Sequence, residues 1–174
     1  MKKVLLIIFS LIIAAVILSP SDQPLTYVGA AKCQICHKTD SQGRQYPIWQ
    51  AGKHASSFVN LSSAKAASMA QSLGVKDPTG DPKCLKCHAP LFAQSPEVKA
   101  EGVTCEACHG PGSEYKKLSL MKDPTEARKN GLVLFADAAA VKDRCLACHA
   151  NAHNLPFDFA SAWDKIKHNI PRKE

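Results

Sequence analysis

Every cysteine of the chain belongs to one short pattern, in which two cysteines separated by two residues are followed directly by a histidine. Two thiols at this spacing bond to the vinyl groups of one haem, and the adjacent histidine reaches the haem iron from the same side. The sequence therefore predicts four covalently bound haem c groups. The four copies are Cys33-Gln-Ile-Cys36-His37, Cys84-Leu-Lys-Cys87-His88, Cys105-Glu-Ala-Cys108-His109 and Cys145-Leu-Ala-Cys148-His149.

Zinc sites and disulfides are the two other common uses of cysteine pairs. A structural zinc ion needs four ligands that converge on one tetrahedral centre, and two such sites would leave the four motif histidines unexplained. Disulfides, which are common in exported chains, would explain none of the histidines that directly follow the second cysteine. Haem attachment is the hypothesis that accounts for every residue of the pattern.

Three of the seven histidines lie outside the motifs, namely His54, His153 and His168. In a chain with so many haem sites and so few histidines, we expect each of them to bind an iron on the side opposite the motif histidine. Three additional imidazoles cannot supply a second ligand to all four haem irons. One haem is therefore five-coordinate, bound by Met69 or Met121, or completed by a neighbouring copy of the chain.

The N-terminus predicts export. Two lysines precede an apolar run from Val4 to Leu18, which breaks at Ser19 and Pro20. The run of about 15 residues is shorter than the roughly 20 that span a membrane comfortably, which favours a signal peptide over residues 1–22. An uncleaved anchor is the alternative, because no clean cleavage site follows. The remaining residues, 23–174, form one domain in the periplasm or on the outer face of the inner membrane.

The formal net charge of +7 does not indicate a nucleic-acid partner. The basic residues are scattered along the chain and few aromatic residues accompany them, whereas nucleic-acid sites gather both on one surface. Haem propionates would add about two negative charges per haem and bring the loaded protein nearer neutrality.

The pattern of elements predicts a mainly α, loop-rich single domain organised around four haems. Capping residues, apolar spacing and glycine stops mark four helices. The short connection 89–104 is expected to bring the second and third haems together. The expected helices cover 46–59, which carries His54; 61–73, which ends at Gly74; the segment from Asp123-Pro124-Thr125-Glu126 to Gly131; and a C-terminal helix in which Phe159, Trp163 and Ile166 share one face before His168.

Several segments resemble the cytochrome c-554 family of small tetrahaem proteins. The resemblance covers roughly residues 27–170, and the segment around the third motif is its most specific part. The matching segments are Tyr27-Val-Gly-Ala, Trp49 with Lys53-His54-Ala55, Gly102-Val-Thr-Cys-Glu-Ala-Cys-His-Gly-Pro-Gly112, and Phe157-Asp-Phe-Ala-Ser-Ala-Trp-Asp-Lys-Ile-Lys-His168.

The resemblance implies a set of iron ligands. It assigns His54 to the third haem and His168 to the fourth, and it leaves His88 as the sole protein ligand of the second. Family members carry a histidine after the H-G-P-G turn that caps the first haem, but residues 113–117 of this chain contain none. His153, a neighbouring subunit and Tyr115 are the remaining candidates for that position.

Closely packed haems predict an electron carrier that accepts electrons from one redox protein and passes them to another in a respiratory chain, with no catalytic residue. An enzyme that converts nitric oxide or hydroxylamine at an open haem is the first alternative, with Glu114 or Lys116 as proton donor. A membrane-anchored or polymerising subunit of a conductive assembly is the second.

Overall fold

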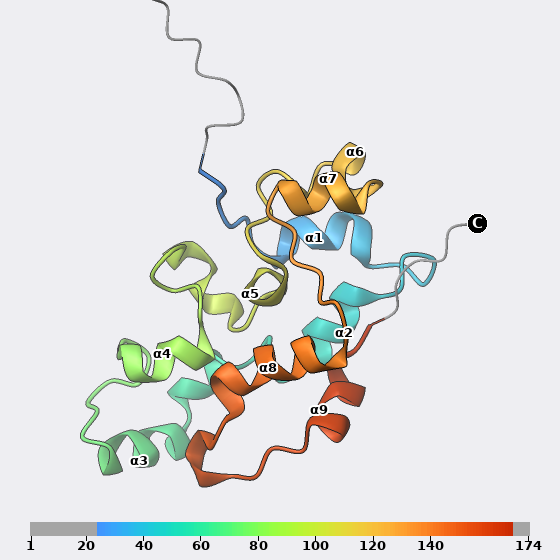
Figure 1. Ribbon diagram of the computed structural model, residues 1–174. Coiled ribbons are helices and arrows are strands. Elements are labelled where there is room, and N and C mark those ends of the chain that lie inside the picture. The colour runs from blue at the N-terminus through green and yellow to red at the C-terminus, as the bar shows by residue number, and fades with distance from the viewer. Residues whose placement is uncertain (1–23, 169–174) are drawn as a thin grey trace, which may run out of the picture.

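The computed structural model describes residues 24–168, which form short helices joined by turns and contain no strand (Figure 1). This confirms the predicted mainly α, loop-rich fold. In chain order the elements are α1 (Ala30–His37), α2 (Gln45–Ala51), η2 (Val59–Ser62), α3 (Ala64–Ser72), α4 (Pro82–His88), η3 (Pro96–Glu101), α5 (Cys105–His109), α6 (Leu118–Met121), α7 (Pro124–Lys129), α8 (Ala138–His149), η4 (Ala152–Asn154) and α9 (Phe159–Ile166).

Each of the four cysteine motifs forms the end of a helix. The motif histidine is the last residue of α1, α4, α5 and α8. Two cysteines three positions apart share one face of a helix, so both thiols point to the same side. The histidine then lies at the C-terminal end of the same turn. Helix formation thus brings the two thiols and the imidazole of each motif together on one short helical segment.

Side-chain caps explain where most of the helices begin. A hydroxyl or carboxylate oxygen accepts a hydrogen bond from a backbone N–H of the first turn, which would otherwise have no partner. Proline follows the cap in α4 and α7, where its missing N–H costs nothing. The capping residues are Ser63, Asp81, Thr104, Asp123, Asp137 and Asp158.

The helix expected over 46–59 is wrong in its extent. Helix α2 begins one residue earlier, at Gln45, and ends at Ala51, because Gly52 leaves the helical region with φ −85° and ψ 162°. His54 therefore lies in a turn between α2 and η2. The other three expected helices are present as α3, α7 and α9, with Gly74 and Gly131 in left-handed conformations beyond the first two.

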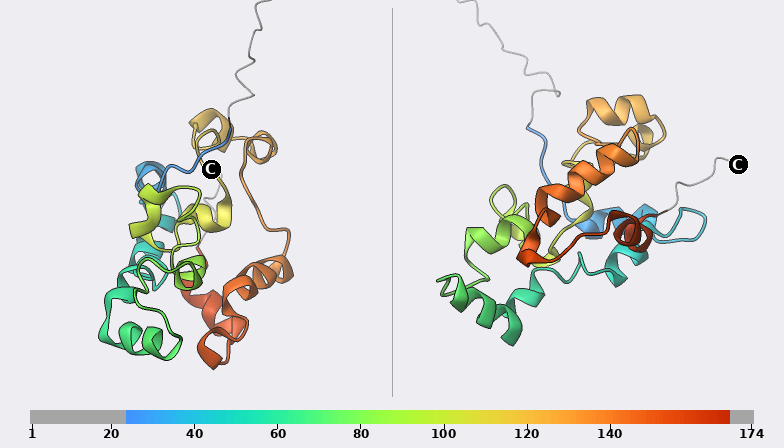
Figure 2. Two further views of the ribbon diagram at one scale, coloured as in Figure 1. Left: turned by 90° about the vertical axis from the view of Figure 1, so that its left-hand side faces the viewer. Right: turned by 60° about the horizontal axis from the view of Figure 1, so that its bottom comes forward.

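The helices of the described residues pack in small groups. Helix α1 contacts α2 and α5, η2 contacts α3, and α6 contacts α7. Helix α8 crosses the middle of the molecule in Figure 1, and the two turned views in Figure 2 show α6 and α7 together at one end. Within residues 24–168 there are two small apolar clusters, one around Leu61 and Leu85 and one around Leu91 and Val98.

The expected signal peptide or anchor over residues 1–22 lies outside the described residues. Within residues 24–168, no helix has the length and apolar character that crossing a membrane requires.

Replacing Asp123 with alanine is expected to lower the free energy of unfolding by about 1 kcal/mol, the usual value of an N-cap. Its carboxylate accepts from the N–H groups of Thr125 and Glu126 at 2.9 and 3.1 Å, and no other cap is present at this end of α7. Urea unfolding of the loaded protein measures the change. The control is Thr125→Ala, which leaves the cap in place, and an equal loss in both variants would contradict the prediction.

Candidate haem centres

Three histidine pairs face one another across the molecule. The rings of His54 and His149 are 6.2 Å apart between centroids, those of His88 and His153 are 6.1 Å apart, and those of His109 and His168 are 5.9 Å apart. Each pair joins one motif histidine to one of the three histidines outside the motifs. The structure therefore brings every non-motif histidine to a motif.

The spacing within these pairs fits a metal ion held between two imidazoles. A first-row metal binds an imidazole nitrogen at about 2 Å, so two rings on opposite sides of one ion have centroids roughly 6 Å apart. Direct stacking or hydrogen bonding would bring the rings closer. Among the described residues, no three side chains of His, Cys, Asp or Glu converge as a zinc site requires.

The pairing differs from the one that the resemblance implied. His54 faces the fourth motif and His168 faces the third, so these two partners are exchanged. His153 faces the second motif, where the resemblance left His88 alone. His153 follows His149 by only four residues, and its loop turns the ring away from the fourth motif and toward the second.

Hydrogen bonds at Nδ1 orient the motif histidines and leave Nε2 free to bind a metal. The Nδ1–H of His88 donates to the Ser57 carbonyl at 2.8 Å, and that of His109 donates to the Val133 carbonyl at 3.0 Å. A backbone carbonyl only accepts, so it fixes the tautomer of the ring. His149 is held differently, by the ring of Phe157, which stacks on it at 4.6 Å.

Burial lowers the pKa of four of these histidines, because it disfavours the charged imidazolium. Neighbouring histidines lower the pKa of three of them further: His149 acts on His54, His37 acts on His109, and both His109 and His37 act on His168. A neutral imidazole is the form that binds a metal. The four residues are His54, His109, His149 and His168.

Ser57 connects the turn that carries His54 to the second motif. Its hydroxyl lies 2.7 Å from the His54 carbonyl and 2.8 Å from the His88 carbonyl, and it accepts from the N–H of Val103 at 3.1 Å. Gly102, with φ 70°, packs directly against this turn, where a Cβ would lie 2.5 Å from the His54 carbonyl oxygen. Contacts among Ser57, Gly102 and Val103 thus set the positions of both His54 and His88.

A strained loop presents His153. Asn151, His153 and Asn154 all have φ 57°, in the left-handed region that residues with a Cβ seldom adopt. Asparagine tolerates this conformation better than most residues, whereas histidine at the centre of the loop does so at some cost. The strain places the exposed His153 ring opposite His88.

The cysteines show which motifs are neighbours. Cys33 and Cys105 are near enough to shift each other's pKa, and the pKa of Cys148 is raised by burial and by Cys87. Arg144, which precedes the fourth motif, donates to the Ala107 carbonyl in the third. The motifs are thus linked in the order first, third, fourth, second. The expected closeness of the second and third haems stays a prediction.

A buried carboxylate holds the N-terminal segment against the third motif. Glu106, which is 1 % exposed, accepts from the N–H of Val28 at 3.0 Å, of Gly29 at 2.8 Å and of Gly112 at 2.7 Å. Beside it, Glu101 accepts from the N–H of Ala30 at 2.7 Å. These bonds fix the start of α1, and hence the first motif, relative to the third.

A cavity of about 650 Å³ lies between α5 and α8. Its lining is mostly apolar and includes Tyr27, Leu91, Val133 and Phe135, and Cys108 borders it. The volume is within the range of cofactor sites, and the thiol at its wall belongs to the third motif. The charged side chains of Glu106, Asp143 and Arg144 also line the cavity, and neither His109 nor His168 borders it, so the cavity by itself does not define a haem pocket.

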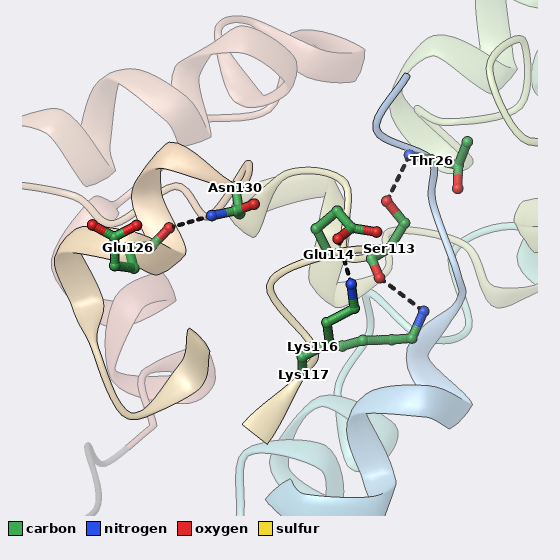
Figure 3. A network of polar contacts seen from close by, with 7 residues as sticks. All are labelled: Thr26, Ser113, Glu114, Lys116, Lys117, Glu126 and Asn130. Carbon is green, nitrogen blue, oxygen red and sulfur yellow. Dashed lines mark hydrogen bonds and ion pairs between the residues drawn. The ribbon is translucent and has the colours of Figure 1, made fainter. Parts of the chain in front are cut away.

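The loop after the H-G-P-G turn is used for structural contacts (Figure 3). Thr26 donates to the Ser113 hydroxyl at 3.0 Å, Lys116 donates to the Ser113 carbonyl at 3.0 Å, and Lys117 pairs with Glu114 at 2.6 Å. At the edge of the same view, Asn130 donates to the Glu126 carbonyl at 2.8 Å and closes α7. Glu114 and Lys116, considered above as proton donors, thus hold the loop.

Tyr115, in the same loop, was a candidate iron ligand. Its hydroxyl donates to the Gly110 carbonyl at 2.9 Å, and the side chain is buried. Burial raises the pKa of Tyr115, so the phenol stays protonated and does not offer the phenolate that a haem iron binds.

Sequence analysis missed the residues that orient the ligands. Ser57 and Val133 act through backbone carbonyls. Every residue type has such a carbonyl, so the sequence does not reveal this role. Glu106 did leave a signal, since it is a charged residue inside the most specific matching segment, but its burial depends on contacts far along the chain.

Comparison with known proteins supports the same class of site. Residues 32–110 match the family model described as cytochrome c554 and c-prime. Cytochrome c-554 of Nitrosomonas europaea is 29 % identical over 178 aligned positions, which cover 91 % of this chain and 74 % of that protein. The solved structure of the reduced state of cytochrome c554 from the same organism aligns with a TM-score of 0.53 at 26 % identity, covering 78 % of this chain and 71 % of the other.

Short helices that end in cysteine motifs, with imidazoles facing the motif histidines, define a multihaem c-type cytochrome: an electron carrier with covalently bound haem that exchanges electrons with redox proteins. The chain is similar to the cytochrome c-554 family, whose model matches residues 32–110. The thiols and the facing imidazoles fit haem, which would supply the redox-active iron.

Proposed function

We propose that this chain is an exported tetrahaem cytochrome that transfers electrons between two redox proteins of a respiratory chain. Each motif attaches one haem through its two cysteines, and its histidine is the proximal ligand. The distal ligands are His153 for the second haem, His168 for the third and His54 for the fourth. The functional domain is 23–174, preceded by a signal peptide or membrane anchor over 1–22.

The histidine pairs carry this proposal. Six of the seven histidines face one another in three pairs, and each pair contains one motif histidine and one non-motif histidine. A packing accident would pair rings without regard to the motifs. Bis-histidine ligation saturates the iron and suits outer-sphere electron transfer rather than substrate binding.

The neighbour relations of the motifs support rapid transfer within the protein. Contacts between first and third, third and fourth, and fourth and second motifs form an unbroken series. Electrons entering at either end of this series reach the other through closely spaced haems. We expect the donor and the acceptor to dock near the first and the second motif, the two ends of this series.

The test is a count of haems and electrons in the mature holoprotein. Intact mass is expected to give four haems per chain, and a redox titration is expected to take up four electrons reversibly. N-terminal sequencing shows whether residues 1–22 are removed. Fewer than four haems, or irons that do not release their electrons to a redox partner, would overturn the proposal.

A second function is favoured by one observation, namely that no imidazole faces His37. An iron with one protein ligand binds small molecules such as nitric oxide or hydroxylamine. The conductive-assembly alternative gains nothing from this observation, because the other histidines already face partners within the chain and a second copy has none to spare.

A further inference from the structure

His37 is the histidine without a facing ring. All seven histidines lie within the described residues, and the other six form the three pairs. His37 ends α1 and is half-buried, while Cys36 beside it is exposed and Ile35 is 71 % exposed. The first motif is therefore the one that lacks an internal imidazole, and it lies at the surface.

The side chains that replace the family's histidine are engaged elsewhere. Tyr115 is buried and donates to Gly110, Glu114 pairs with Lys117, and Lys116 donates to the Ser113 carbonyl. Each would have to break a contact that holds its own loop in order to reach an iron. A second copy of the chain offers no unpaired histidine beyond its own His37.

His37 also has a different hydrogen-bond partner from the other motif histidines. Its Nδ1–H donates to the side-chain Oε1 of Gln45 at 3.3 Å, whereas His88 and His109 donate to backbone carbonyls at 2.8 and 3.0 Å. The hydrogen-bond acceptor at Nδ1 controls how strongly the imidazole binds its metal. A long hydrogen bond to a neutral amide oxygen pulls least on the Nδ1 proton, so it strengthens the imidazole as a ligand least. Gln45 is the first residue of α2, which packs against α1.

Resting on the proposed function, we propose that the haem of the first motif has the open coordination position, where a small iron-binding ligand of the nitric oxide or carbon monoxide type binds, and that Gln45 is the positioning residue that sets the strength of the His37 bond. The open site is thereby moved from the second motif, where the resemblance places it, to the first. His153 closes the second motif.

Resonance Raman spectroscopy of the reduced holoprotein tests the proposal, because the iron–histidine stretching band arises only from five-coordinate ferrous haem. One band is expected, and carbon monoxide is expected to bind one haem in four and remove it. In Gln45→Glu the carboxylate accepts more strongly, so the band moves to higher frequency. In Gln45→Leu the acceptor is lost and the band moves to lower frequency.

The matched control is Gln50→Glu, which adds the same charge at an exposed position of α2 and is expected to leave the band in place. A band that stays fixed in both Gln45 variants would assign the open position to another motif. Four low-spin irons in the ferric protein would overturn the open site altogether. In that case, loss of a methionine charge-transfer band in Met121→Leu would identify Met121 as the second ligand of the first haem.

Failure of this proposal is distinct from failure of the proposed function. A protein with four haems and reversible uptake of four electrons, but no iron–histidine band, keeps the electron-transfer role and loses the open site. A protein with fewer than four haems loses the proposed function, and the open site falls with it.

Discussion

In the ferric His153→Ala protein, the high-spin fraction is expected to double, from one haem in four to two. His153 is the ring that faces His88 at 6.1 Å, and alanine leaves the second haem with His88 as its sole protein ligand. Quantified EPR measures the two fractions against total haem. Added imidazole is expected to bring both high-spin haems to the low-spin state, because the free ring fills the open position of the first haem and the position that the His153 side chain has left on the second.

The control for this variant is Leu155→Ala, which alters an exposed residue of the same loop and leaves His153 in place. Its high-spin fraction is expected to match that of the unaltered protein. Relief of the left-handed conformation at residue 153 does not mimic the effect, since imidazole rescue requires a vacant iron position. An unchanged high-spin fraction in His153→Ala would show that another residue binds the second haem.

Glu106→Gln is expected to lower the free energy of unfolding by about 3 kcal/mol, a large loss for an isosteric change. Both carboxylate oxygens accept from backbone N–H groups, Oε1 from Val28 and Gly112, and Oε2 from Val28 and Gly29. An amide replaces one of these acceptors with a donor. At least one N–H then faces another donor in a site that water does not reach.

Urea unfolding of the loaded protein measures this loss, with Glu114→Gln as the control. Glu114 pairs with Lys117 at the surface, where removal of one ion pair changes stability little. If the two variants unfold at the same urea concentration, the buried carboxylate does not hold the N-terminal segment to the third motif as described.

The motifs and several of the helix starts were predictable because they are local. The spacing of Cys33, Cys36 and His37 defines one turn of helix, and Asp123 with Pro124 defines a helix start, without any knowledge of the rest of the fold. The 46–59 helix was overextended because apolar spacing continues past Gly52, and the extended conformation of that glycine is what ends it.

The pairing of ligands was not predictable in the same way. It depends on the path of the chain between segments far apart in sequence, and on turns such as the left-handed loop at His153, for which residue type gives little warning. The resemblance supplied a pairing, which the facing rings of His54, His153 and His168 do not follow. The buried position of Glu106 has the same origin, since its donors lie far along the chain.

The segment from His149 to His168 contributes one ring to each of the three facing pairs. A chain is made from its N-terminus, so its first three motifs emerge before any of these rings exists. Thioether attachment at those motifs can proceed early, whereas six-fold coordination waits for the last segment. With the ligands proposed above, the second, third and fourth haems would gain their second imidazole only after this last segment has been made, whereas the first would need no ring from it.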